Sequence, residues 1–109
     1  MDKQSKYLFD IQSSIHLIEL FTQDIYTFEQ YMNDIKTQSA VERQLGIIGE
    51  AANKIRQEDA EILSQIKQIV DFRNRIIHSY DNIDANIVWV IIKKYLPILK
   101  SEVDKKLIQ

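Results

Sequence analysis

Apolar residues recur every three or four positions along most of the chain, which is the spacing of an amphipathic α-helix. The pattern is clearest over residues 7–21, 41–55 and 61–80, and it returns between residues 84 and 99. We therefore predict a long helix over each of these ranges. The fourth helix of the chain is expected to run from about Glu61 to Tyr80.

Capping residues indicate where the helices begin. Residues 27–30 and residues 39–42 both have the spacing of a capping box, in which two side chains satisfy each other's free backbone N–H groups. The first box predicts the start of a short helix. The second predicts that the third helix starts at Ser39, and Asp84 is expected to cap the fifth.

The spacing also predicts which faces are buried. In the third helix the inward face should comprise Val41, Leu45, Ile48, Ala52 and Ile55. In the last helix it should comprise Ile87, Ile91, Tyr95 and Ile98, with a kink at Pro97. Gly46 and Gly49 lie inside the third helix, where each glycine costs roughly 1 kcal/mol relative to alanine. Their presence predicts that another backbone approaches closely there.

The composition favours an all-α fold. The chain of 109 residues has two glycines and one proline, which leaves little turn material for many short strands. Its length suits a single domain over residues 1–109, with a hydrophobic core that is thin for a monomer. We therefore expect a homodimer.

Charge and cysteine content exclude several classes of function. The absence of cysteine excludes a disulfide framework, a thiolate nucleophile and a zinc site built on cysteine. No apolar run approaches the length needed to span a membrane, and no signal-like N-terminus is present, so a cytoplasmic protein is expected. The net charge of −2 gives no general attraction for nucleic acid, so any contact with RNA must come from a local patch.

Arg73 is the most informative residue, because it lies in the apolar stripe of its helix. A guanidinium stays charged and is costly to bury alone, so it must meet an acidic side chain, a cleft between subunits or a phosphate. Glu50, between apolar positions of the third helix, is a candidate partner. Such an ion pair would fix the register of the helices without any chemistry.

Asn74 and His78 accompany Arg73 on the same helix. They are four residues apart, so the Asn74 amide could orient the imidazole of His78. His78 lies about 140° round the helix from Arg73, too far for both to enter one core. Either the helix loosens near His78, or the two residues line a groove that a second chain completes.

These residues resemble a known signature. Arg73-Asn74, then His78 and Tyr80, is similar to the motif of HEPN-domain ribonucleases, specifically the HepT-type toxins encoded beside minimal nucleotidyltransferase (MNT) antitoxins. Residues 45–52 and 84–99 resemble the family's central and last long helices, so the resemblance covers nearly the whole chain. Ser79 departs from it, because the family commonly has glycine there.

The resemblance implies a HEPN-like bundle of four to five helices that forms a homodimer. It also implies a toxin that cleaves RNA without a metal or other cofactor. His78 would transfer protons, Arg73 would bind the scissile phosphate, and Asn74 would orient either group. An MNT antitoxin would neutralise the toxin by moving AMP from ATP onto Tyr80.

Two other hypotheses remain open. The chain could be a non-catalytic HEPN module that binds RNA, a nucleotide or its MNT partner, with Arg73 and His78 as contacts only. It could also be a helical dimerisation module in which Arg73 simply pairs with Glu50.

Overall fold

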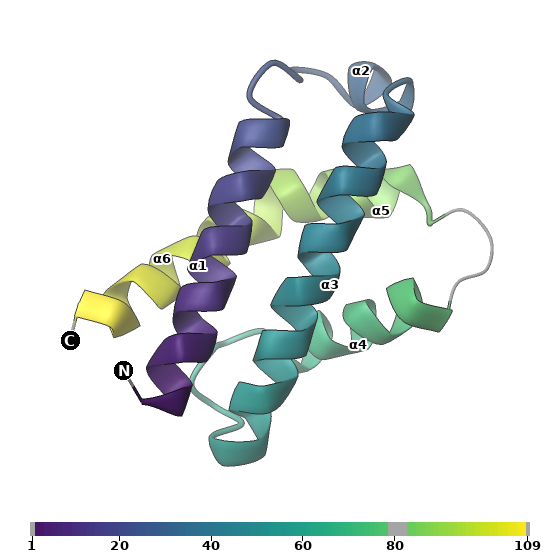
Figure 1. The fold of residues 1–109 in the computed structure, drawn as a ribbon. Helices are drawn as coiled ribbons and strands as arrows, with labels where there is room; N and C mark the ends of the chain where they lie inside the picture. The colour runs from purple at the N-terminus through teal and green to yellow at the C-terminus, as the bar shows by residue number, and fades with distance from the viewer. Residues whose placement is uncertain (1, 79–82, 109) are drawn as a thin grey trace.

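The computed structural model describes residues 2–78 and 83–108, and all regular elements in those ranges are helical (Figure 1). They are α1 (Lys3–Phe21), α2 (Phe28–Met32), α3 (Ile35–Glu58), α4 (Ile66–His78), α5 (Ala85–Val90), the π-helical turn η1 (Ile91–Tyr95) and α6 (Leu96–Ile108). Because α5, η1 and α6 follow one another without a break, the described residues form five helical segments. The prediction of an all-α bundle is confirmed.

The long helix α3 is the centre of the bundle. It runs antiparallel beside α1, and the segment from α5 to α6 crosses behind this pair (Figure 1). The helix α4 packs against α3, and α6 packs against α1. Every long helix therefore touches α1 or α3, and α4 is positioned by its packing on α3.

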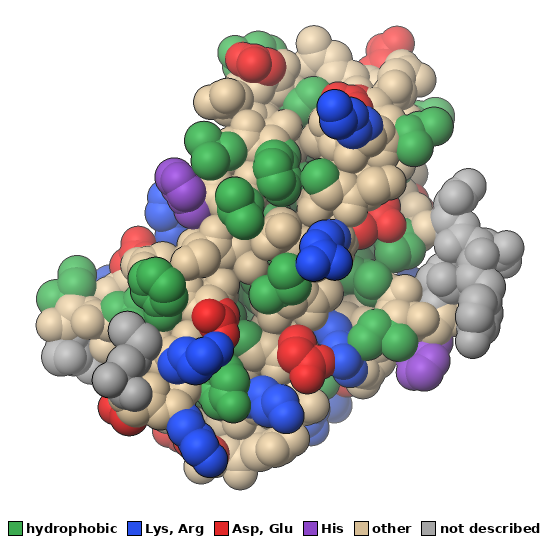
Figure 2. Space-filling view, in the orientation of Figure 1, with side chains coloured by type: hydrophobic (Ala, Val, Ile, Leu, Met, Phe, Trp, Pro, Cys, Tyr) green, Lys and Arg blue, Asp and Glu red, His purple; other side chains and the backbone are tan. Residues whose placement is uncertain are grey.

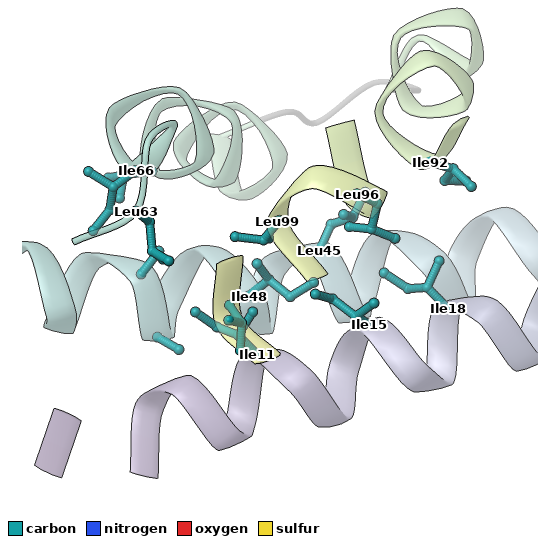
Figure 3. Packing of buried hydrophobic residues seen from close by; sticks show 14 of the residues in the cluster. Ile11, Ile15, Ile18, Leu45, Ile48, Leu63, Ile66, Ile92, Leu96 and Leu99 are labelled. Atoms are coloured by element: carbon teal, nitrogen blue, oxygen red, sulfur yellow. The ribbon is translucent and has the colours of Figure 1, made fainter. Parts of the chain in front are cut away.

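The hydrophobic core lies where α1, α3 and α6 meet. Figure 3 shows Ile15 and Ile18 of α1 beside Leu45 of α3 and Leu96 of α6. The predicted inward face of α3 is confirmed, because Val41, Leu45, Ile48, Ala52 and Ile55 are all buried. Full burial of a leucine or isoleucine side chain stabilises the fold by about 1.5–3 kcal/mol, so this core holds the three helices together.

The start of α3 differs from the prediction. The capping box of residues 27–30 is present at the start of α2, as expected. At α3, however, Asp34 is the N-cap: its Oδ1 accepts from the Thr37 N–H (3.0 Å), and its Oδ2 accepts from the Thr37 hydroxyl (2.7 Å). The prediction that the helix starts at Ser39 is therefore wrong, because Asp34 already caps the helix five residues earlier.

The start of α4 was also predicted too early. The helix begins at Ile66 rather than near Glu61. The Ser64 backbone N–H donates to Glu102 of α6 (3.1 Å), and the Ser64 hydroxyl donates to the same carboxylate (2.9 Å). The Ser64 N–H therefore bonds a side chain of α6 and not a carbonyl of its own helix. Leu63, the residue before it, is buried in the core. A contact distant in sequence thus outweighs the local helical pattern.

The last helical segment turns a different face inward from the one predicted. Its buried residues are Val88, Ile92, Leu96, Leu99 and Val103. The predicted inward residues Tyr95 and Ile98 are instead exposed at 37% and 44%. Most residues between Ala85 and Leu99 are apolar, so periodicity alone does not fix the rotation of this part of the segment.

The irregularity expected at Pro97 takes the form of the π turn η1. The Leu96 N–H bonds the Ile91 carbonyl five residues back, and Pro97 follows directly with no N–H to offer. The change of helical geometry therefore occurs where the regular hydrogen-bond pattern has to be interrupted.

The cap of α3 gives a test of this helix boundary. Asp34→Ala should lower the free energy of unfolding near neutral pH, whereas Ser39→Ala, at an exposed position inside the helix, should leave it almost unchanged. Hydrogen bonds from Thr37 hold the pKa of Asp34 below its ordinary value of 3.8. A lowered pKa means that the carboxylate stabilises the folded protein above the ordinary value and loses this effect as the pH falls through the folded-state value.

Urea unfolding followed by circular dichroism measures the difference. The gap between wild type and Asp34→Ala should shrink as the pH is lowered below the ordinary value. Equal losses in the Asp34→Ala and Ser39→Ala variants near neutral pH would contradict the helix start at Asp34.

Candidate active site

Arg73 reaches the surface by crossing α3 at a glycine. The buried side of α4 carries Ile66 and Val70, and Arg73 continues this side one turn later. A Cβ added at Gly49 would overlap the Cβ and Cγ of Arg73, and it would lie 3.4 Å from the Arg73 Cα. The aliphatic stem of the arginine therefore lies directly on the α3 backbone. The close approach predicted at Gly49 is confirmed.

Gly46 has a different environment. Within the described chain, no heavy atom would lie within 4 Å of a Cβ added there. The close approach predicted at this second glycine is therefore wrong for a single chain. The two glycines are separated by less than a turn of α3, so α4 crosses at one point and not along the whole helix.

The guanidinium of Arg73 is held between two polar side chains. Its Nη2 forms a short ion pair with Oε2 of Glu50, and its Nη1 donates to Oδ1 of Asn74 (3.2 Å). The Arg73 side chain is 24% exposed and that of Glu50 is 50% exposed. In the part of the chain that the structure describes, the buried Nε has no hydrogen-bond partner. The Arg73 side chain is thus largely desolvated but keeps some exposed surface.

His78 stands apart from this cluster. It is the last residue of α4 and is exposed, as is Asn74. The helix α4 remains regular up to His78, and the residues after it, where the helix was predicted to loosen, lie outside the described residues. The imidazole therefore lies about 140° round the helix from Arg73.

The predicted contact between Asn74 and His78 is not made between these described residues. The Asn74 carbonyl accepts from Arg73 instead. The fold therefore brings Arg73, Asn74 and Glu50 together within one chain, but does not add His78 to them. Tyr80 and Ser79, the other residues of the motif that the sequence singles out, lie outside the described residues.

The charges around the site are mixed. The face formed by α1 and α3 carries apolar side chains interspersed with both acidic and basic ones (Figure 2). Arg43, Lys54, Arg56 and Lys67 are all exposed, as expected for solvated surface charges. Over residues 2–78 and 83–108, no group of three or more His, Cys, Asp or Glu side chains is arranged to hold a metal ion. No helix there is long and apolar enough to cross a membrane.

Sequence reasoning did not identify Gly49 as the partner of Arg73. The signal was present, because a glycine inside a helix next to an acidic residue is unusual. What the sequence lacks is the crossing point of α3 and α4. The position of this crossing decides whether Arg73 packs on Gly46 or on Gly49.

The chain was compared with known proteins. Residues 11–105 match the sequence model of the family described as Ribonuclease HepT-like. A protein of Thermococcus cleftensis named probable ribonuclease HepT is 39% identical over 101 residues, which cover 91% of each chain. A protein of Methanocaldococcus jannaschii, named provisionally as an RNase, is 36% identical over 100 residues, covering 90% of this chain and 91% of that one. Comparison with solved structures gives no match.

The two glycines of α3 form a matched pair of test positions. Gly49→Ala should lower the free energy of unfolding by about 1–3 kcal/mol, because the new methyl group would overlap the stem of Arg73. Gly46→Ala should raise it by up to about 1 kcal/mol, because the site is open and alanine favours a helix. Chemical denaturation of the two variants measures both effects. A Gly49→Ala variant as stable as Gly46→Ala would show that α4 does not cross α3 at this point.

Proposed function

Because the chain belongs to the ribonuclease HepT-like family, we propose that it is a cytoplasmic endoribonuclease that cleaves RNA through Arg73, Asn74 and His78. The observation that carries this proposal is the way in which the Arg73 side chain is held. Its stem is fixed against Gly49, while its guanidinium faces a partly exposed site between Glu50 and Asn74. A cation fixed at one end and accessible at the other suits recognition of a phosphate.

The reaction proposed needs only groups of this kind. RNA is cleaved when its 2′-hydroxyl loses a proton and attacks the adjacent phosphorus, and the leaving 5′-oxygen then takes up a proton. Histidine side chains exchange protons near neutral pH, so His78 is the candidate acid or base. Arg73 would stabilise the negative charge that develops on the phosphoryl oxygens. This mechanism uses the nucleophile of the substrate itself and requires no metal.

Glu50 has a supporting role in this scheme. Half of the Glu50 side chain is exposed, so its carboxylate can turn into water when an RNA phosphate takes its place on the guanidinium. Until then Glu50 holds the guanidinium in place. Asn74 meets the second nitrogen of the same guanidinium and would keep its orientation once phosphate is bound.

The position of His78 supports a site shared by two copies of the chain. Arg73 and His78 point in directions about 140° apart on α4, so one chain does not direct both at a single phosphate. One histidine also serves two proton transfers poorly. A homodimer in which two α4 helices border one cleft would supply both histidines and both arginines. We propose this arrangement for the active enzyme.

We further propose that the enzyme is the toxin of a toxin–antitoxin pair. The support is the motif, in which Tyr80 follows His78 at the family's spacing. An MNT antitoxin would transfer AMP from ATP onto the Tyr80 hydroxyl. The added phosphate would compete with RNA for Arg73 and Arg75, which precede it on the same segment.

A non-catalytic module is the second candidate, and one observation favours it. The Arg73–Glu50 pair is the contact expected if the arginine only fixes the packing of α4 on α3. In that case the protein would bind RNA, a nucleotide or the MNT partner without cutting. Glu50→Gln separates the two functions, because it removes the charge of the pair and leaves Arg73 in place.

The nuclease proposal is tested with purified variants and single-stranded RNA. Arg73→Ala and His78→Ala should each lower the cleavage rate by at least about 100-fold, because each removes a group needed in the transition state. Glu50→Gln should retain most activity, and all three should keep the helix content of wild type. The wild-type products should end in 2′,3′-cyclic phosphate, persist in excess EDTA and be absent when DNA replaces RNA.

Three results would contradict this assignment. Unfolding of Arg73→Ala, or an equal loss of activity in Glu50→Gln, would make Arg73 a member of a structural ion pair. Loss of cleavage on chelation would contradict the metal-independent mechanism. An inactive wild-type protein that still binds RNA would support the non-catalytic module.

The proposed modification is tested by co-expression with the cognate antitoxin. Tyr80→Phe keeps the aromatic ring but removes the oxygen that would accept AMP, so this variant should remain toxic and resist neutralisation. Intact-mass analysis of wild type should show one or more added AMP units that map to Tyr80. Tyr26→Phe is the matched control, since Tyr26 is 73% exposed and should leave both neutralisation and mass gain unchanged. Equal neutralisation of wild type and Tyr80→Phe, with no mass change, would instead indicate inhibition by binding alone.

A further inference from the structure

A second recessed site lies on the other side of α4 from Arg73. It is a groove of about 600 Å³ between α4 and the segment from η1 to α6, with α3 as its base. Phe72 and Arg75 of α4 line it. They lie about 100° and 160° round the helix from Arg73, so this groove is separate from the Glu50 cluster. We call it the α4–η1 groove.

The walls of the α4–η1 groove are apolar and aromatic. Its base is formed by buried aliphatic side chains such as Leu45 and Leu99. Phe72 is half-buried on one wall, and Tyr95, 37% exposed, lies on the other. Tyr95 is thus the more exposed of the two aromatic side chains that line the groove. Flat, apolar faces of this kind suit a planar aromatic ligand.

The rim of the groove is polar. Gln65, Gln68 and Arg75 come from the α4 side, together with the acidic Asp71. Two carboxamides offer both donors and acceptors, and a guanidinium offers a fixed set of donors to an anion. Lys94 lies 5.5 Å from the centre of the Tyr95 ring, which adds a second cation next to the groove.

The π turn η1 forms one wall of the groove. Its first and last residues, Ile91 and Tyr95, both line the cavity, and Leu96 directly after it lines the base. Single π-helical turns inside α-helices are frequent at functional sites. Both residues were expected to face the core. Ile91 is partly buried against it, whereas Tyr95 is exposed on the wall of the groove.

We propose that the α4–η1 groove binds an unpaired nucleobase of the RNA substrate. The base would stack on Tyr95 and Phe72, its edge would bond Gln65 or Gln68, and Arg75 would meet the adjacent phosphate. Arg75 and His78 are three residues apart and therefore neighbours on α4. A strand anchored in the groove thus passes His78, which links base recognition to the cleavage position. This inference rests on the proposed ribonuclease function.

Binding is measured without any cleavage. Backbone amide resonances of the wild-type protein are followed by NMR during titration with each of the four ribonucleoside 5′-monophosphates. Ribose 5-phosphate is the control that lacks a base. The nucleotides should shift resonances within residues 65–72 and 91–95, and ribose 5-phosphate should not. Loss of one stacking contact typically weakens binding by about 5- to 150-fold, so Tyr95→Ala should show a weakening in this range.

Two further variants keep the test decisive. Gln68→Ala, at an exposed position of α4, should weaken binding and reduce the difference between bases even if Tyr95→Ala folds poorly. Tyr26→Ala removes an exposed tyrosine that does not line the groove and should bind as wild type does. Cleavage of short single-stranded RNAs should show a raised KM in Tyr95→Ala, with kcat changed less.

Several outcomes would overturn the proposal. These are the absence of shifts in both ranges, equal shifts with ribose 5-phosphate, or an unchanged KM in Tyr95→Ala. A smaller oligomer on sedimentation of Tyr95→Ala would show that the groove is a contact between copies of the chain. Nucleotide binding in the groove of a protein that cuts no RNA would contradict the ribonuclease function while leaving the base site in place.

Discussion

The packing of Arg73 on Gly49 is the contact on which the rest of the structure depends. The aliphatic part of an arginine packs like an apolar side chain while its charged end remains in water. Gly49 permits this on the face of α3, because any side chain there would meet the Arg73 stem. The crossing of α3 and α4, the direction of the guanidinium and the ion pair with Glu50 all follow from that contact.

Much of this arrangement follows from the sequence, and the parts that do not have physical reasons. Local signals suffice for the all-helical fold and the inward face of α3, and they identify Glu50 as one candidate partner of Arg73. They fail where contacts between residues far apart in sequence set a helix boundary. An example is Ser64, which bonds Glu102 and lies before the start of α4. They also fail in the last helix, because a mostly apolar sequence fits the core in more than one rotation. The sequence signals also do not bring His78 close to Arg73, because the two side chains leave α4 of one chain in directions about 140° apart.

Arg73 has an acidic partner, and the chain as a whole has a net charge of −2, so neither the site nor the chain attracts nucleic acid strongly from a distance. A bare guanidinium at the surface would attract any polyanion, whereas a carboxylate beside it weakens that long-range attraction. At contact distance a phosphate can make two parallel hydrogen bonds to a guanidinium, whereas the Glu50 carboxylate contacts only Nη2 of Arg73. In the proposed function, phosphate recognition at this site would therefore depend on fit at short range more than on long-range attraction. The mixed charges of the α1–α3 face are consistent with this.

The contact at Gly49 also fixes the point at which α4 is held on α3. One end of its segment is tied to α6 through Ser64 and Glu102, and Arg73 sits at the crossing point itself. His78 is five residues farther along, which is about 7.5 Å of helix. Between these two contacts Ile66 and Val70 of α4 are buried in the core. The segment is therefore held from Ser64 to Arg73, whereas His78 lies on the part of α4 that continues past the crossing with α3.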